Sequence, residues 1–237
     1  MKQFQYYLPT ALQKIGYVIF FVLYKVFVCI EIRGKEHIKA LSRNRNLTQP
    51  IILASNHTSE LDVTAMPLVL PFFSQLYPIY FVSNMTEKYK TFGWRSYMYG
   101  GVFFNMLGGY AVHSGSHDYA VALEDHLLLL KQKRGRTLWI SPEGMRTRDG
   151  RMNPARGGLG YLVYDTNAIV IPIAIDTFFN MNAWDFFTRR RKVVITVGRP
   201  MTRSELFTSP NATTTPLVED FRHAGQIVLD KIEEMME

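Results

Sequence analysis

Short apolar runs recur along the middle of this chain, and helical segments separate them. Each run is typical of a buried strand. Strands that alternate with helices predict an α/β fold, with a mainly parallel sheet covered by helices on both faces. The expected strands are residues 51–54, 79–83, 137–140, 168–175 and 193–197.

The helical segments complete this pattern. A length of 237 residues suits one large domain, and no long polar or Pro-rich linker divides the chain. A short strand and turn at 31–34 and a polar loop at 42–49 are also expected. The expected helices after the first are residues 60–70, 92–107, 116–133, 157–164 and 216–236.

The first helix, residues 8–30, is strongly apolar but carries Lys14 and Lys25. Eleven positions at about 100° per residue bring both lysines to nearly the same face. We interpret the helix as an interfacial membrane anchor with a narrow polar stripe. A short tilted span and a helix buried in the core are the alternatives. The chain then divides into an anchoring helix, residues 1–30, and a main domain, residues 31–237.

Two further stretches, 72–81 and 92–107, are rich in aromatic residues. They are consistent with a second membrane-facing patch or with the wall of an acyl pocket. Ordinary core packing explains the same composition.

The charge balance restricts the partners. The formal net charge is +7, which suits nucleic acid, an anionic membrane or acidic ligands. Aromatic residues make up 14% of the chain, which favours a membrane, and no nucleic-acid-binding motif is visible. We therefore expect membrane lipid and no nucleic acid among the partners.

A histidine and an aspartate follow the first of the long apolar runs. His57 falls at the expected strand-to-helix corner, and Asp62 falls one turn into the helix. A carboxylate in that position can accept a hydrogen bond from one imidazole nitrogen and leave the other free as a base. The carboxyl ends of strands are where open α/β sheets place their sites. We expect His57 and Asp62 to form the catalytic centre.

A second candidate cluster follows the expected strand 137–140. Arg146 and Arg148 lie beside Gly144, where guanidinium groups can bind phosphate and glycine lets the backbone approach a ligand. A solvated basic face explains Arg146 equally well. Glu143 is a candidate to orient an arginine or a substrate hydroxyl.

Metal chemistry is a weaker alternative. His113 and His117 have the spacing of two ligands on one helix, which would suit a metal-dependent hydrolase. The intervening Ser-Gly-Ser indicates a turn, and no convincing third ligand is present. We therefore expect no metal site.

Four stretches, taken together, resemble the motifs of the lysophospholipid acyltransferase superfamily, the 1-acylglycerol-3-phosphate acyltransferase-like (PlsC-like) proteins. The resemblance covers roughly residues 31–200. It rests on the N-H-x4-D pattern of His57 and Asp62 and on residues 108–113, 142–148 and 170–174.

The resemblance implies a glycerol-3-phosphate acyltransferase-like fold and an O-acyltransferase activity in residues 31–237. The acyl group would pass from acyl-CoA or acyl carrier protein, the co-substrate, to the hydroxyl of a lysophospholipid. His57 would be the general base and Asp62 would orient it. No metal, other cofactor or covalent acyl-enzyme is implied.

The same resemblance assigns the remaining candidate residues and the location. The protein would be membrane-associated on the cytosolic face, which is the inner membrane in a bacterium. Pro172 would be an acyl-pocket or structural residue. The implied substrate-binding residues are Glu143, Gly144, Arg146, Arg148, Gly109 and His113.

Two departures from the family pattern concern the acceptor. His113 stands where members that use glycerophosphate acceptors usually carry an arginine, and Met145 replaces the usual threonine. Lysophosphatidic acid is therefore one candidate acceptor, and another hydroxylated lipid is the alternative. A catalytically silent lipid-binding protein on the same fold is the other alternative.

Overall fold

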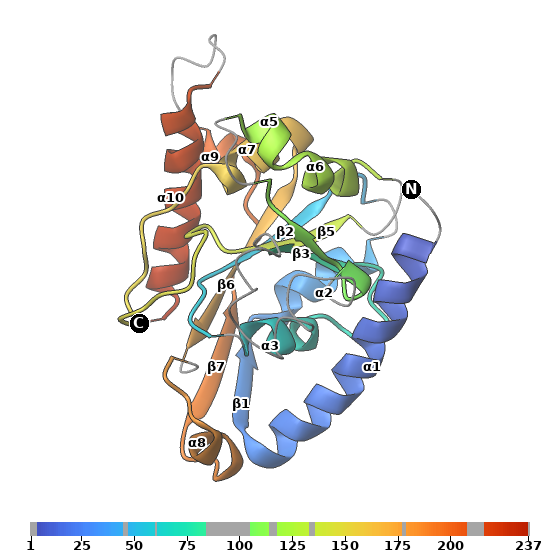
Figure 1. Cartoon of the computed structure of the whole chain (residues 1–237), viewed down its shortest axis with the longest axis vertical. Helices are drawn as coiled ribbons and strands as arrows, with labels where there is room; N and C mark the ends of the chain where they lie inside the picture. Colours follow the sequence, from blue (N-terminus) through green and yellow to red (C-terminus); the bar gives the residue numbers. More distant parts are fainter. Residues whose placement is uncertain are drawn as a thin grey trace.

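The computed structural model describes residues 4–44, 47–59, 61–83, 105–113, 118–132, 136–176, 179–207 and 216–236. A seven-stranded sheet forms its centre, in the order β1-β7-β6-β2-β5-β3-β4 (Figure 1). The strands are β1 (Cys29–Arg33), β2 (Ile51–Ser55), β3 (Ile79–Ser83), β4 (Gly109–Ala111), β5 (Thr137–Ile140), β6 (Ile169–Asp176) and β7 (Lys192–Val197).

Five of the six strand pairs are parallel, and only β6 and β7 are antiparallel. The expected mainly parallel sheet is therefore confirmed. Strand β7, and β1 parallel to it, therefore run opposite to the other five strands. As a result, β7 and β1 begin at the edge of the sheet where β2 and β6 end.

Helices cover both faces of the sheet (Figure 1). Alternate β2 residues face opposite sides: Ile51 and Leu53 join one buried cluster, whereas Ile52 and Ala54 join the other. The first cluster packs under α1 (Phe4–Phe27), α2 (Lys35–Arg43) and α3 (Asp62–Val69). The second packs under α5 (Tyr119–Ala122), α6 (Glu124–Leu130), α7 (Gly158–Thr166), α9 (Arg203–Leu206) and α10 (Val218–Glu234).

Several local expectations need correction. The expected single helix 116–133 is two short helices, α5 and α6, because the backbone leaves helical geometry at Leu123 with φ −117° and ψ 18°. The Ala122 carbonyl beside this break accepts a hydrogen bond from the His113 main chain at 3.1 Å. Helices α2 and α8 (Ala183–Phe187) and the short α9 were not expected, and most of the expected helix 92–107 lies outside the described residues.

The first helix packs against the domain through its polar residues. Gln13 is buried, and its side-chain amide bonds both the main-chain N–H and the carbonyl of Ile79, at 2.9 and 2.6 Å. The Tyr24 hydroxyl lies 2.5 Å from the Thr64 hydroxyl of α3. This side of α1 therefore packs against the sheet and α3.

The opposite face of α1 is exposed and apolar. Residues Tyr7–Phe27 are long and apolar enough to cross a membrane, with a mean hydropathy of 1.4. A helix fully buried in the core is excluded, because many large apolar side chains of α1 reach the surface. The most exposed of these are Tyr7, Ile15, Val18, Ile19, Phe21, Val22 and Val26.

Candidate active site

The centre of the site is the pair expected from the sequence. His57 follows β2 directly, and Asp62 is the first residue of α3. Their Nδ1 and Oδ2 atoms are 2.9 Å apart. The Asp62 side chain is fully buried, whereas the His57 side chain is 27% exposed. A neutral imidazole that donates Nδ1–H to Asp62 keeps a lone pair on Nε2, which can accept a proton.

Buried Asp62 is held by main-chain donors as well as by the imidazole. The N–H groups of Thr58 and Ser59 donate to its Oδ2 at 2.8 and 3.0 Å. Its place in the first turn of α3 adds the favourable end of the helix dipole. These donors satisfy a charge that would be costly to bury alone, and they fix the direction of the carboxylate.

The end of β2 is fixed against the neighbouring strand. Asn56 is buried, and its side-chain amide pairs with the main chain of Ile175 in β6 through two hydrogen bonds of 2.8 Å. The side chain thereby continues the strand pairing by one residue past β2. His57, the next residue, is held at a defined point on the edge of the sheet.

Glu143 and Thr147 fix the main chain of His57 from the other side. The His57 N–H donates to Glu143 Oε1 at 3.0 Å, and the Thr147 N–H donates to the His57 carbonyl at 3.0 Å. The second Glu143 oxygen accepts from the main-chain N–H and the side-chain amide of Asn153, at 2.8 and 3.1 Å. Glu143 is 1% exposed, and these partners differ from the arginine or substrate hydroxyl that we expected.

An aromatic side chain that the sequence analysis did not single out lies beside the imidazole. Trp139 of β5 is 5% exposed and packs edge to face with His57, with ring centroids 6.2 Å apart. Its indole N–H donates to the Ser55 hydroxyl at 2.7 Å. The only sequence signal was an aromatic residue on the strand that neighbours β2. Trp139 limits the positions that the His57 ring can take.

The loop that carries the two candidate arginines is compact. Arg146 and Arg148 are exposed, while Thr147 between them is buried. Gly144 has φ +66°, and an added Cβ would lie 2.7 Å from the Cδ of Arg156. Glycine is required there both by the left-handed backbone and by the close side chain. Because Thr147 bonds the His57 carbonyl, the loop that carries both arginines is tied directly to the catalytic pair.

The other candidate residues lie farther from His57. Gly109 is buried in β4 beside Phe81, and β4 is three strand positions from β2, about 14 Å at ordinary strand spacing. His113 is exposed, and its Nε2 lies 3.4 Å from Asp125 Oδ2. Pro172 is buried in β6 opposite Ala54, where its carbonyl accepts from the Gly198 N–H at 2.8 Å. That contact gives Pro172 a structural place in the sheet.

A buried histidine lies next to His113 and Asp125. His126 is completely buried, and its Nε2 lies 3.2 Å from the Tyr110 carbonyl. Burial lowers the pKa of His126 to about 4, so the ring is neutral near pH 7. His117 is outside the described residues, and within the described ranges no three His, Cys, Asp or Glu side chains group to hold a metal.

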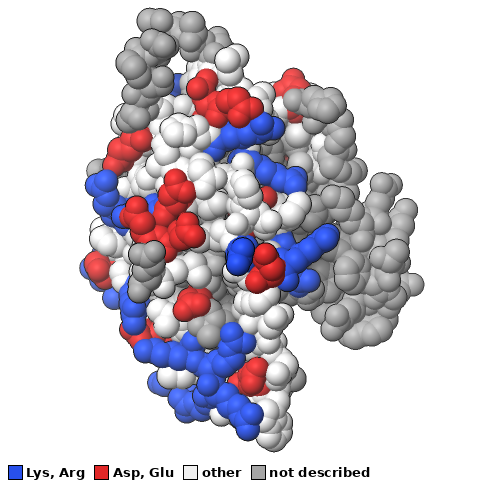
Figure 2. All heavy atoms as spheres, turned by 90° about the vertical axis from the view of Figure 1, so that its left-hand side faces the viewer, with Lys and Arg blue, Asp and Glu red and all other residues white. Residues whose placement is uncertain are grey.

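The positive charge is unevenly distributed. On the face shown in Figure 2, Lys and Arg side chains gather at the lower end, where Figure 1 places α8 and the start of β7. Residues 189–192, the run Arg-Arg-Arg-Lys, lie there. Lys192 is paired with Glu31 of β1. The arginines before it therefore supply much of the local charge.

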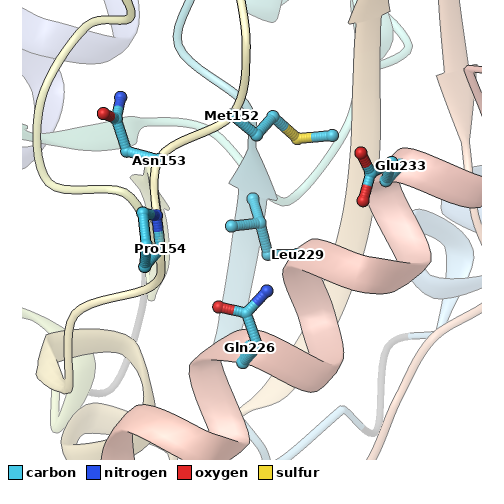
Figure 3. A pocket seen from close by; sticks show the side chains of 6 residues that line it. All are labelled: Met152, Asn153, Pro154, Gln226, Leu229 and Glu233. Atoms are coloured by element: carbon cyan, nitrogen blue, oxygen red, sulfur yellow. The ribbon is translucent and has the colours of Figure 1, made fainter.

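A hollow of about 340 Å³ lies beside α10 (Figure 3). It separates residues 152–154 from α10 and is lined by Met152, Asn153, Pro154, Gln226, Leu229 and Glu233. Asn153, which also bonds Glu143, is the link between this hollow and the site. Neither His57 nor Asp62 lines it.

Comparison with known proteins places this geometry in a family. The family model described as "Acyltransferase" matches residues 29–176, which include all seven residues from Asn56 to Asp62 and the loop 143–148. Among curated proteins, the chain is similar to 1-acyl-sn-glycerol-3-phosphate acyltransferase alpha from Mus musculus, with 25% identity over 73% of this chain. The Homo sapiens protein of the same name is 23% identical over 72% of this chain. The chain spans about half the length of these curated relatives, 53% and 52%.

A solved structure shares the fold. The crystal structure of the 1-acyl-sn-glycerophosphate acyltransferase PlsC from Thermotoga maritima superposes with a TM-score of 0.59 and 20% sequence identity. The superposition covers 96% of this chain and 79% of that one. This similarity confirms the expected acyltransferase-like α/β fold.

Proposed function

This chain belongs to the acyltransferase family, and we propose that it transfers a fatty acyl group from a thioester donor to the hydroxyl of a lysophospholipid. The single observation that carries the proposal is the 2.9 Å contact between Nδ1 of the partly exposed His57 and fully buried Asp62, which leaves Nε2 as the ring nitrogen that does not bond Asp62. The curated relatives are named for acylation of 1-acyl-sn-glycerol-3-phosphate, which is a lysophospholipid.

In the proposed reaction, His57 Nε2 takes the proton from the acceptor hydroxyl as its oxygen attacks the thioester carbonyl. The resulting oxyanion collapses, the C–S bond breaks, and the imidazolium returns its proton to the leaving thiolate. Asp62 holds the Nδ1–H and stabilises the positive ring between these steps. A positioned base of this kind contributes about 10²–10⁴-fold, and holding the two substrates together supplies much of the rest.

The donor in this proposal is acyl-CoA or acyl carrier protein, both of which are acidic. Exposed arginines at 146 and 148 lie on the loop that is bonded to His57, where they can bind phosphate on the acceptor or the donor. A non-phosphatidate lipid is the second candidate acceptor, because His113 and Met145 depart from the family pattern. The Asp125 carboxylate beside His113, with Oδ2 3.4 Å from Nε2, favours that candidate, because a carboxylate repels an acceptor phosphate.

Membrane association through residues 1–30 is part of the proposal, with residues 31–237 forming the acyltransferase domain. The exposed apolar face of α1 supports it, since large apolar patches of this kind indicate contact with lipid or a partner. We place the site on the cytosolic face, where acyl-CoA and acyl carrier protein are made available. In a bacterium this is the inner membrane.

The test is an acyltransferase assay on the full chain in detergent–lipid micelles. Acyl-CoA and acyl carrier protein are each supplied with lysophosphatidic acid, other lysophospholipids and a phosphate-free hydroxylated lipid. We expect a new ester with at least one lysophospholipid. Transfer only to the phosphate-free lipid would establish the second acceptor class instead. Lipid binding without transfer to any acceptor would indicate the catalytically silent alternative and contradict the proposal.

A further inference from the structure

Two aromatic side chains project from α8 into solvent. Trp184 is 63% exposed and Phe187 is 57% exposed, although both are large enough to contribute strongly to a core. Neighbouring exposed aromatic residues are uncommon on a surface that contacts only water. Trp in particular is enriched at the boundary between lipid tails and headgroups, where its ring is buried and its N–H stays near water.

Basic residues follow these aromatic residues immediately. Arg189 and Arg190 are exposed, and the Arg190 guanidinium lies 5.9 Å from the centre of the Trp184 ring. Arg191 is turned the other way and donates to the Phe179 carbonyl at 2.8 Å. We call residues 184–190 the α8 corner. It combines an apolar tip with positive charge, which complements the acyl chains and phosphates of an anionic bilayer.

The α8 corner packs against the C-terminal end of α1. Phe187 packs against Phe27, with ring centroids 5.2 Å apart, and Phe186 packs against Tyr24 at 5.7 Å. Figure 1 shows α8 beside the C-terminal end of α1. A bilayer that contacts the end of α1 therefore meets the α8 corner as well.

The topology of the sheet places the connection that holds α8 at the same edge as His57. The connection that holds α8 leaves β6 at its carboxyl end, and β6 is parallel to β2, whose carboxyl end carries His57. Helix α1 also ends at this edge, because β1 runs opposite to β2. The last turn of α1, the α8 corner and His57 all lie along one edge of the sheet.

We propose that the α8 corner is a second membrane contact, which binds the headgroup region of an anionic bilayer and holds the His57 edge of the sheet against the lipid surface. Trp184 and Phe187 enter the boundary of the acyl chains, and Arg189 and Arg190 bind lipid phosphates. The inference rests on the proposed membrane association through α1. It adds a preference for anionic lipid that α1 alone does not explain.

The first test follows Trp184 directly in the full chain reconstituted into phosphatidylcholine–phosphatidylglycerol vesicles. The difference between the emission of the wild type and of Trp184→Phe reports this residue alone. We expect this difference to fall at least twofold when the lipids carry brominated acyl chains, which quench tryptophan on contact. An equal difference in brominated and ordinary vesicles would overturn the proposal.

The second test separates charge from apolar contact. The pair Arg189→Gln and Arg190→Gln is expected to lower partition onto vesicles that contain phosphatidylglycerol at least tenfold, because it removes two charges that attract anionic headgroups. Partition onto pure phosphatidylcholine should be unchanged. The control pair, Arg222→Gln and Lys231→Gln, removes the same charge from α10 on the other helical layer and should change partition less than twofold.

The outcomes distinguish this inference from the proposed function. Equal partition of the two double variants onto anionic vesicles would overturn the role of the α8 corner, while wild-type binding to those vesicles would still support the membrane association. A wild-type chain that binds neither kind of vesicle would contradict the membrane association itself. Circular dichroism of each variant checks that the fold is retained.

Discussion

Glu143 Oε1 accepts a hydrogen bond from the main-chain N–H of His57 at 3.0 Å, although 86 residues separate the two. Its other oxygen is occupied by Asn153, so the carboxylate joins the end of β2 to the loop after β5. We infer that Glu143 is a positioning residue, because it holds the backbone from which the imidazole projects.

Glu143→Gln tests this role. The amide group of glutamine would turn an N–H donor toward either His57 or Asn153, where the carboxylate accepted. Because a displacement near 1 Å can cost about 10²-fold, we expect kcat to fall by roughly that factor while KM changes little. Steady-state kinetics, at a temperature where circular dichroism shows both proteins folded, measure the effect.

Glu233→Gln is the matched control for that change, since Glu233 is an exposed carboxylate on α10. It should keep wild-type kcat. An unchanged kcat in Glu143→Gln, or a loss confined to KM, would count against positioning and favour direct contact with a substrate.

Gly144 should be intolerant of a side chain. Gly144→Ala places a Cβ on a backbone with φ +66° and 2.7 Å from Arg156 Cδ, so we expect a loss of about 1–3 kcal/mol in the free energy of unfolding. Gly158→Ala in α7 meets nothing closer than 3.7 Å and should be neutral or slightly stabilising. Chemical unfolding of the two variants measures the difference, and equal stabilities would contradict this account of the loop.

Buried His126 should make the protein sensitive to acid. Its folded-state pKa is lowered to about 4, while a histidine in the unfolded chain has an ordinary pKa of 6.5. The unfolded state therefore binds a proton first, and the stability present above pH 6.5 is lost as the pH falls from 6.5 toward 4. Thermal unfolding between pH 7.5 and 4 should show this loss, and His126→Gln should reduce it. The same pH dependence in both proteins would contradict the assignment.

Arg146 provides a test of phosphate recognition. If its guanidinium binds an acceptor phosphate, Arg146→Ala removes a charge-assisted bond worth about 1.5–3 kcal/mol. We expect KM to rise roughly 10- to 100-fold for phosphate-bearing acceptors and to change little for a phosphate-free one. Arg222→Ala on α10 is the control. A uniform rise for all acceptors would instead assign Arg146 to the donor or to the structure of the loop.

The contact between His57 and Asp62 was predictable because its signals are local. An apolar strand and the short spacing between His57 and Asp62 both lie between residues 51 and 62, and the structure has the strand as Ile51–Ser55. The strands 79–83 and 137–140 were placed correctly for the same reason. Hydrophobic pattern within a few residues is enough to define such elements.

The features that were missed depend on distant partners. The contact of Glu143 with His57 requires the register between β2 and β5, which no local pattern contains. The reversed direction of β7 depends on the path through α8. Gln13 is polar, yet it is buried because the backbone of Ile79 satisfies its amide. Tertiary contacts overrode the local signal in each case.

The central claim is that His57 is the base that takes the proton from the acceptor hydroxyl. The most direct measurement is kcat/KM for the best acceptor, with the wild type, His57→Ala and the control His223→Ala, which removes an exposed imidazole from α10. We predict that His57→Ala lowers kcat/KM by about 10²–10⁴-fold while the fold is retained, and that the control does not. Undiminished turnover in a folded His57→Ala protein would rule out His57 as the base.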